Sequence, residues 1–295
     1  MTLSAAGLRP EALRLGFIGT GRLATTLARS MAQCGLAVTM VANRSPDAAR
    51  QLAQAIAGCK SATPQEVAAG CDLIFITTID GAIAATADGL AWRADSAVVH
   101  CSGVTEVSVL AKPAQDGALT GGFHPLQSFG TVEAALRSLP GCTITIEAPA
   151  ALDALLSQIA IRLQCRVNHL PPGARARYHA SAGYASQFVH VLLREASQVW
   201  QSWGASEEDA VAALLPLLRG TLASLQSAGL AGGLPGPVSR GDIDSVARHV
   251  AALSALDPAL LALYQLLCAR SIPLGLERGG INAAQAARLR VLLGA

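Results

Sequence analysis

Short apolar segments alternate with longer amphipathic ones through the first half of the chain. Continuous apolar runs of this length predict buried parallel strands, and apolar positions three or four residues apart predict the helices between them. This alternation is typical of an α/β fold with a doubly wound parallel sheet, which binds ligands at the carboxyl ends of its strands. The predicted strands span residues 15–18, 38–42, 72–77, 97–100, 142–147 and 165–168.

The second half reads differently, because only helical patterns follow Pro171. We therefore expect two domains, a nucleotide-binding α/β domain over residues 1–171 and an all-helical substrate-binding and dimerisation domain over residues 172–295. The first helix predicted there, over residues 176–203, is apolar on most sides, as a helix buried in a subunit or domain interface is. A Gly/Pro-rich break is expected over residues 229–237, and further helices are expected to begin at Ser206, Asp242, Asp257 and Asn282.

A glycine-rich turn joins the first predicted strand to the first predicted helix. Gly19 allows a sharp turn, Gly21 lets the backbone approach a pyrophosphate, and the small Ala24 lets helix and strand pack closely. The strand before and the helix after favour a dinucleotide site, with the pyrophosphate at the helix N-terminus, over a purely structural turn. The residues assigned to the cofactor here and at the end of the neighbouring strand are Gly19, Thr20, Gly21, Arg22, Leu23, Ala24, Thr77 and Thr78.

The second strand is followed by Asn43, Arg44 and Ser45, where an NAD-selective site usually carries an acidic residue for the ribose hydroxyls. A guanidinium and a hydroxyl can bind a 2′-phosphate, which a carboxylate would repel, so the predicted cofactor is NADP(H). Arg22 could add charge at this phosphate or at the pyrophosphate. The alternative is that Arg44 is a solvated loop residue and Asn43 a turn residue.

Composition excludes some classes of function. The 295 residues carry a net charge of +2, which provides no electrostatic footprint for nucleic acid or for an anionic membrane. Hydrophobic residues make up 52% of the chain against 14% charged residues, a surplus that suggests a homodimer whose interface covers apolar surface. The seven cysteines include no CxxC pair and are expected to be buried thiols in a reducing cytosol, without a structural metal. The N-terminus lacks a signal-peptide pattern and no stretch has the uniform apolarity of a membrane span, so we expect a soluble cytoplasmic protein.

Polar groups at two strand ends are candidates for chemistry. Ser102 follows a buried strand, where it could contact the nicotinamide or the substrate, although a strand-end turn with a hydrogen-bonded His100 is an equal alternative. Residues 122–130 are expected to form a loop that carries His124 beside a proline. An imidazole near the nicotinamide could donate a proton to the alkoxide formed by hydride addition, the alternative being a structural histidine that locks the loop.

Two further clusters lie in the predicted helical domain. His179 and Gln187 share one face of the long helix and, with Tyr178, could bind a substrate carboxylate or carbonyl, or could be the polar start of a helix with one interhelical hydrogen bond. Arg240 lies in a loop bracketed by proline and glycine and could bind a substrate carboxylate through two nitrogens. Asp242 is expected to cap the helix that follows. The predicted catalytic residues are therefore His124, His179, Ser102, Gln187 and Arg240.

Several motifs together resemble those of one protein family. The segments GFIGTGRLATTLA, VVHCSG, FHPLQSFG, YHASAGYAS and GPVSRGD, with NRS after the second strand, resemble bacterial reductase-like proteins in which an NADP-binding Rossmann-like domain precedes a helical domain of unknown function. The resemblance spans nearly the whole chain. These proteins are similar to ketopantoate reductases, pyrroline carboxylate reductases and short-chain hydroxyacid dehydrogenases, with a C-terminal domain like that of 6-phosphogluconate dehydrogenase.

The resemblance implies an NADPH-dependent reductase of a small carboxylate-bearing, ketopantoate-like keto acid. This chain has Gly183 and Gln187 where the hydroxyacid dehydrogenases and ketopantoate reductases carry a lysine and an asparagine, so the proton must come from His124 or His179. The alternatives are a catalytically silent NADP-binding sensor or scaffold, and an enzyme like pyrroline carboxylate reductase or prephenate dehydrogenase. A deazaflavin-dependent NADP reductase is a further alternative, against which the large helical domain argues.

Overall fold

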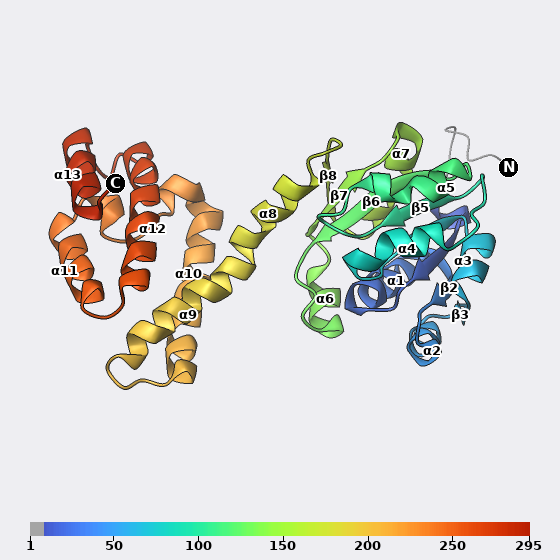
Figure 1. The fold of residues 1–295 in the computed structure, drawn as a ribbon, viewed down its shortest axis with the longest axis horizontal. Coiled ribbons are helices and arrows are strands. Elements are labelled where there is room, and N and C mark those ends of the chain that lie inside the picture. The colour runs from blue at the N-terminus through green and yellow to red at the C-terminus, as the bar shows by residue number, and fades with distance from the viewer. Residues whose placement is uncertain (1–8) are drawn as a thin grey trace. The chain divides into compact units, whose positions relative to one another are not determined.

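An eight-stranded sheet forms the centre of the first structural unit (Figure 1). The computed structural model describes residues 9–295, so residues 1–8, which carry most of the segment tested for a signal peptide, lie outside the described residues. Neighbouring strands are parallel except β6 and β7, and the order is β3-β2-β1-β4-β5-β6-β7-β8. The strands are β1 (Arg14–Ile18), β2 (Ala37–Ala42), β3 (Lys60–Ser61), β4 (Leu73–Ile76), β5 (Ala97–His100), β6 (Leu119–Leu126), β7 (Thr143–Glu147) and β8 (Arg166–His169).

Helices pack on both faces of this sheet. The α-helices of the first unit are α1 (Arg22–Gln33), α2 (Pro46–Gln54), α3 (Pro64–Gly70), α4 (Ile83–Asp88), α5 (Ala111–Gln115), α6 (Val132–Ser138), α7 (Ala150–Arg162) and α8 (Arg175–Ala185). Along β4, Phe75 belongs to a core with α1 and α7, whereas its neighbours Ile74 and Ile76 belong to a second core with α3 and α4. Successive residues of a strand point to opposite faces, so the predicted doubly wound α/β fold is confirmed.

Residues 122–126 of the segment predicted as a loop around His124 are instead the second half of β6, so the prediction is wrong for this part, whereas residues 127–130 lie outside the strand. His124 and Pro125 pair with Thr145 and Ile144 of β7 in an antiparallel ladder, whereas β5 pairs with β6 only as far as Gly122. Beyond that point one edge of β6 is free, which is where a strand tolerates proline. This segment therefore forms a strand although its glycines and proline are typical of a loop.

The long helix predicted over residues 176–203 is two helices, α8 and α9 (Gln187–Gln201). Ser186 lies between them with φ −132° and ψ −85°, outside the helical range. The two compact units of the chain divide at the same point, the first ending at Ser186 and the second beginning at Gln187. The first unit thus includes α8, whereas the predicted boundary lay at residue 171. The reason is that Arg175 of α8 is buried and hydrogen-bonded to Glu147 of β7.

The second unit is helical, and its core joins α11, α12 and α13 through Val246, Ile272 and Leu289. Asp242 and Asn282 cap helices with their side chains, as predicted. The helices after α9 are α10 (Glu207–Gly232), η4 (Val238–Arg240), α11 (Ile243–Ser254), α12 (Pro258–Glu277) and α13 (Ala283–Leu293).

Helix α10 has a kink where the break was expected to begin, because Gly229 has a positive φ of 71°, and the helix ends at Gly232 within the expected range of 229–237. Helices α10 and α12 depart from the sequence prediction in another respect. Both helices are long and apolar enough in composition to cross a membrane, which was not expected. Only 6% of the most apolar stretch of α10 and 17% of that of α12 are buried within the described chain. This unit therefore exposes apolar helix surface.

Candidate active site

The glycine-rich turn lies at the carboxyl end of β1, as predicted. Gly19 has a positive φ of 107°, and a Cβ there would lie 2.6 Å from the carbonyl oxygen of Thr77. Gly21 has an ordinary φ of −68°, and a Cβ there would meet no atom within 4 Å. Ala24 is fully buried and Leu23 packs against the same core. The backbone therefore requires glycine at position 19, and the space over Gly21 is open for a pyrophosphate at the N-terminus of α1.

Two threonine hydroxyls at this turn lack a protein partner. Thr20 Oγ1 and Thr78 Oγ1 are buried, and neither makes a hydrogen bond to residues 9–295. By contrast, Thr77 Oγ1 donates to the carbonyl oxygen of Gly19 at 2.9 Å and ties the ends of β1 and β4 together. Because buried polar groups almost always have partners, the two unpaired hydroxyls beside an open helix N-terminus fit the ribose and pyrophosphate oxygens of a dinucleotide.

Arg22 makes a contact that was not predicted. Its Nη1 donates to the carbonyl oxygen of Gly130 at 2.6 Å, which ties the N-terminus of α1 to the segment after β6. The assignment of Arg22 to a phosphate stays a prediction, with one of its nitrogens already engaged.

The turn after β2 leaves a cation and a hydroxyl at the surface. Asn43 Oδ1 accepts a hydrogen bond from the backbone amide of Arg44 at 2.8 Å, so Asn43 shapes the turn. Arg44 is exposed, and Ser45 occupies the N-cap position of α2 without a side-chain capping bond. An adjoining hollow of about 280 Å³ is lined by Asn43, Pro46, Ser61, Ala62, Thr63, Pro64 and Glu66. This arrangement suits the adenosine end of NADP, with the Arg44 guanidinium available for a 2′-phosphate.

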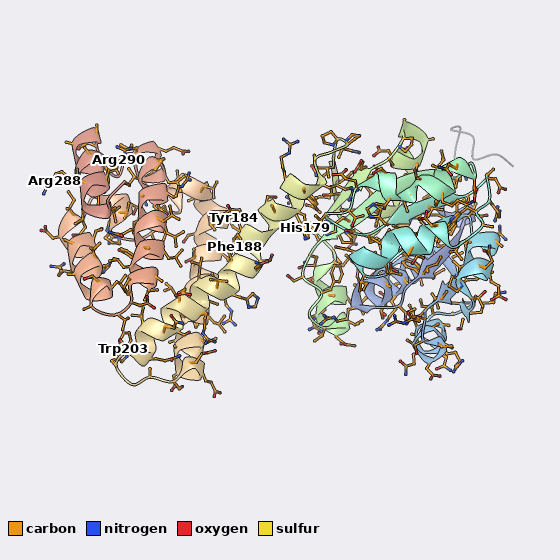
Figure 2. The ribbon with its side chains drawn as sticks, in the orientation of Figure 1. His179, Tyr184, Phe188, Trp203, Arg288 and Arg290 are labelled. Carbon is orange, nitrogen blue, oxygen red and sulfur yellow. The ribbon has the colours of Figure 1, made fainter. Side chains whose placement is uncertain are left out.

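The two predicted catalytic histidines come together over Gly103. A Cβ on Gly103 would lie 2.4 Å from His179 Nδ1 and 2.9 Å from His124 Nε2. The two imidazoles are arranged edge to face, with centroids 5.9 Å apart. His124 comes from β6, Gly103 follows β5, and His179 comes from α8, where Figure 2 labels it. They therefore meet at the carboxyl ends of the parallel strands, the edge of the sheet that also carries Gly19.

A pocket of about 320 Å³ opens beside the histidine pair. Its lining offers imidazole, amide and hydroxyl groups and no carboxylate or guanidinium. This volume is in the range of pockets for small organic molecules. The lining residues are His124, Leu126, Gln127, Ser128, His179, Ser181, Ala182, Ala185 and Ser186.

Burial keeps two histidines at this edge uncharged. Burial above all, and then His179 and the positive charge of Arg175, lowers the pKa of His124 to about 4. Burial, followed by the charge of Arg175, lowers the pKa of His100 to about 3. At neutral pH each ring therefore carries a single proton, so His124 offers one hydrogen-bond donor and one acceptor.

Ser102 has a structural role in the turn after β5. Its hydroxyl donates to Thr105 Oγ1 at 2.8 Å and accepts from the backbone amide of Thr105 at 3.1 Å. These bonds match the turn that the sequence left open as the alternative. The contact of Ser102 with nicotinamide or substrate stays a prediction.

Arg175 belongs to the polar cluster at the start of the predicted long helix, but neither its burial nor its ion pair was predicted from the sequence. Its guanidinium is fully buried, with Nε donating to Glu147 Oε2 at 2.6 Å and Nη1 donating to the carbonyl oxygen of Ser102 at 2.8 Å. It lies against Gly122, where a Cβ would be 1.7 Å from Nη2. A glycine inside a strand can mark a place where another group approaches the backbone closely. Gly122 was therefore the signal in the sequence that could have indicated a buried side chain here.

The remaining predicted catalytic residues, Gln187 and Arg240, belong to the second unit. Arg240 is exposed at the end of η4, and Gly241 after it has a positive φ of 68°. Asp242 accepts a hydrogen bond from the backbone amide of Ser245 at 3.0 Å, which confirms its predicted role as a helix cap. The structure thus brings His124 and His179 together in the first unit. Gln187 and Arg240 belong to the second unit.

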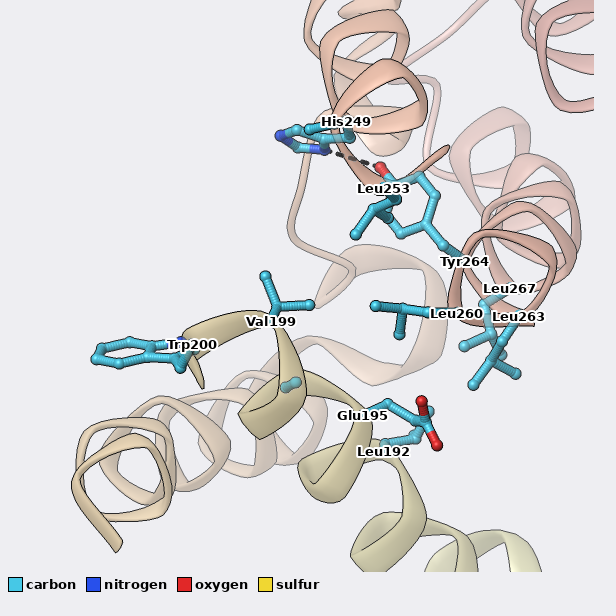
Figure 3. A pocket seen from close by; sticks show the side chains of 12 residues that line it. Leu192, Glu195, Val199, Trp200, His249, Leu253, Leu260, Leu263, Tyr264 and Leu267 are labelled. Atoms are coloured by element: carbon cyan, nitrogen blue, oxygen red, sulfur yellow. Dashed lines mark hydrogen bonds between the residues drawn. The ribbon is translucent and has the colours of Figure 1, made fainter. Parts of the chain in front are cut away.

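The second unit also contains an apolar hollow of about 420 Å³ (Figure 3). Helices α9, α11 and α12 surround it, and its walls include five leucine side chains together with Val199 and Trp200. At one side His249 Nδ1 lies 2.8 Å from the hydroxyl of Tyr264. An apolar lining of this kind suits contact with another apolar surface.

Two known sequence families match separate parts of the chain. Residues 14–102 match the family described as NADP oxidoreductase, coenzyme F420-dependent. Residues 142–271 match the domain of unknown function DUF2520. Among proteins of curated function, none matches the chain in sequence.

Solved structures share the fold over most of the chain. BF3122 of Bacteroides fragilis, a proposed NADP oxidoreductase, is 26% identical with a TM-score of 0.68, over 90% of this chain and 99% of that one. TM1727 of Thermotoga maritima is 22% identical with a TM-score of 0.75, over 90% of this chain and 99% of that one. The reductive aminase of Aspergillus terreus in complex with NADPH is 16% identical with a TM-score of 0.66, over 93% of this chain and 98% of that one.

These similarities confirm the predicted resemblance. The description of the first family names NADP, in agreement with the predicted cofactor, and the second family is a C-terminal domain of unknown function, as expected. The chain thus resembles the NADP oxidoreductase family over residues 14–102 and DUF2520 over residues 142–271.

Proposed function

We propose that this protein is an NADPH-dependent reductase of a small carbonyl or imine compound. The observation that carries the proposal is the convergence of His124 and His179 on Gly103, at the sheet edge that also holds the glycine-rich turn. When bound, NADPH supplies a hydride to an electrophilic carbon. The chain must then bind the substrate beside the nicotinamide and provide a proton, and a histidine pair next to a polar pocket suits both tasks.

The residues of the first unit divide into two groups in this proposal. Gly21, Thr20 and Thr78 hold the pyrophosphate and ribose, and Arg44 with Ser45 binds the 2′-phosphate. His124 and His179 face the substrate, and one of them donates the proton. The amide and hydroxyl groups of the pocket orient the substrate.

We extend the proposal to a small keto acid of the ketopantoate type. The pocket in the first unit offers no guanidinium or ammonium group, so a carboxylate must be recognised by another element. Arg240 is exposed in a tightly folded motif of the second unit, and a guanidinium binds a carboxylate through two parallel hydrogen bonds. The assignment of the carboxylate to Arg240 and of a polar contact to Gln187 stays the prediction made from the sequence.

We propose further that the protein is a homodimer in the cytoplasm. The oxidoreductase fold of the first unit is that of a soluble protein. Leucines are exposed on α10 and α12, and the second unit contains an apolar hollow, features that are typical of surfaces that bind another protein. A second subunit that covers this surface would account for it.

The proposed function is tested by following NADPH oxidation with a panel of small keto acids, ketones and ketone–amine mixtures. Replacing the histidine that donates the proton, by His124→Gln or His179→Gln, is expected to lower kcat about a hundred- to ten-thousand-fold. His169→Gln is the matched control, because His169 is an exposed histidine of β8 that does not line the pocket. NADPH binding without turnover of any substrate would replace the reductase with an NADP sensor.

A second candidate is hydride transfer between NADP(H) and coenzyme F420, a deazaflavin. It is favoured by the family match over residues 14–102. Oxidised coenzyme F420 therefore belongs in the same panel. Turnover with this deazaflavin, and with no carbonyl or imine compound, would establish it in place of the first candidate.

A further inference from the structure

Three polar side chains form a row across neighbouring strands. His124 of β6 pairs with Thr145 of β7, and Thr145 pairs with Asn168 of β8, so the three residues lie side by side on one face of the sheet. Asn168 Nδ2 donates to Thr145 Oγ1 at 3.3 Å. Tyr178 of α8 completes the row, because its hydroxyl lies 2.7 Å from His124 Nδ1 and faces the Thr145 hydroxyl.

A second contact fixes α8 over this row. Arg175 precedes Tyr178 by three residues and therefore lies on the same side of the helix. Its partner Glu147 follows Thr145 by two residues on β7 and therefore points to the same face of the sheet. The Arg175–Glu147 ion pair and the contacts of Tyr178 thus fix the same position of α8 on the sheet. This position holds the Tyr178 hydroxyl against the imidazole of His124.

The hydrogen bonds of the row have one direction of donation. The amide nitrogen of Asn168 can only donate, so the Thr145 oxygen accepts there and its own proton is free to point to Tyr178. When the Tyr178 oxygen accepts from Thr145, its own proton points to His124 Nδ1, 2.7 Å away. The His124 ring is uncharged at neutral pH, because burial lowers its pKa to about 4. A neutral ring that accepts at Nδ1 carries its proton on Nε2.

We propose that Tyr178 is a positioning residue that fixes His124 as the Nε2–H tautomer, with this donor facing the pocket. The atom concerned, His124 Nε2, is the one that lies over Gly103 beside His179. Tyr178 itself does not line the pocket. It acts on the substrate through His124.

The proposal deepens the reductase function proposed above and rests on it for its chemical purpose. Hydride addition leaves extra electron density on the substrate oxygen or nitrogen, and a preorganised donor at that atom stabilises the transition state. The neutral Nε2–H of His124 supplies such a donor. His179 then remains as the group that delivers the proton.

The tautomer can be measured without any substrate. Long-range proton–nitrogen NMR spectra of protein labelled with nitrogen-15 histidine distinguish the two neutral forms, and His124→Gln assigns the signals of His124. The wild-type protein at pH 7 is expected to show the Nε2–H form of His124. Tyr178→Phe is expected to shift it to the Nδ1–H form or to a mixture. An Nδ1–H form in the wild type, or an unchanged tautomer in Tyr178→Phe, would overturn the proposal.

A matched control exists in the second unit. Tyr264→Phe removes the same kind of bond, from a tyrosine hydroxyl to His249 Nδ1, and is expected to leave the His124 signals unchanged. If Tyr264→Phe also shifted the His124 tautomer, the assignment to Tyr178 would be wrong.

Kinetics separate this inference from the proposed reductase activity. Tyr178→Phe is expected to lower kcat about ten-fold or more and to leave the KM for NADPH unchanged. A shifted tautomer with an unchanged kcat would remove Tyr178 and His124 from catalysis. The expected tautomers in a protein without any turnover would support the positioning role and reject the reductase.

Discussion

Replacing Arg175 by methionine is expected to destabilise the first unit by about 3–5 kcal/mol. The guanidinium is fully buried, and the carboxylate of Glu147 that it pairs with is 10% exposed. Without Arg175 the Glu147 carboxylate stays buried but loses its counter-charge, and this accounts for most of the expected loss of stability. The lost hydrogen bond to the Ser102 carbonyl adds about 1 kcal/mol. Methionine retains an unbranched apolar side chain, so the loss reports mainly on the charge.

Urea unfolding measures this loss directly. Trp92 is the tryptophan of the first unit, so its fluorescence reports on that unit once Trp200 and Trp203 are replaced by phenylalanine. Glu147→Gln alone is expected to cost a similar amount. The double variant of Arg175 and Glu147 is expected to lose at least about 2 kcal/mol less than the sum of the single losses, because neither charge then stays buried alone.

Arg177→Met is the matched control, because Arg177 is exposed on the same helix. Its expected effect on the free energy of unfolding is within about 0.5 kcal/mol. A loss below about 1 kcal/mol for Arg175→Met, or additive losses in the double variant, would refute the view that this ion pair anchors α8 to the sheet.

Two further predictions concern pH and the turn after β5. The folded-state pKa values of His100 and His124, about 3 and about 4, lie below the unfolded value of about 6.5, so the unfolded state takes up protons first as the pH falls. The free energy of unfolding is therefore expected to decrease as the pH falls from 6.5 to 4, and at pH 5 each histidine accounts for a loss of about 2 kcal/mol relative to pH 7. Equal midpoints of urea unfolding at pH 7 and pH 5, followed by Trp92 fluorescence, would contradict this. Gly103→Ala places a methyl group between His124 and His179 and is expected to lower kcat/KM about ten-fold or more. Gly81→Ala serves as the control, because a Cβ at Gly81 meets no atom within 4 Å. Equal activities of the two variants would show that the histidine pair is not the reacting site.

The strands and the dinucleotide turn could be predicted because their signals are local. A buried parallel strand needs a continuous run of apolar residues. Such runs are present before Gly19 and around Phe75. The caps Asp242 and Asn282 were equally visible, since a capping side chain bonds to the amide three residues later.

The features that were missed depend on partners distant in the sequence. The second half of β6 is a strand because β7 pairs with it, whereas Pro125 and its neighbouring glycines favour a loop. The helix break at Ser186 has no proline, and Gly183 in the last turn of α8 was not a sufficient local signal to predict it. Arg175 is buried only because Glu147, 28 residues earlier, supplies the opposite charge. Periodicity describes one segment at a time and cannot supply such a pairing.

The central claim is that the first unit binds NADPH through the glycine-rich turn and Arg44. Calorimetric titration of the wild type and Arg44→Ala with NADPH and NADH tests it most directly, with Arg166→Ala, an exposed arginine of β8, as control. We predict that the wild type and the control bind NADPH at least about ten-fold more tightly than NADH, and that Arg44→Ala loses most of this preference. Equal affinities for the two nucleotides, or binding of neither, would contradict the account.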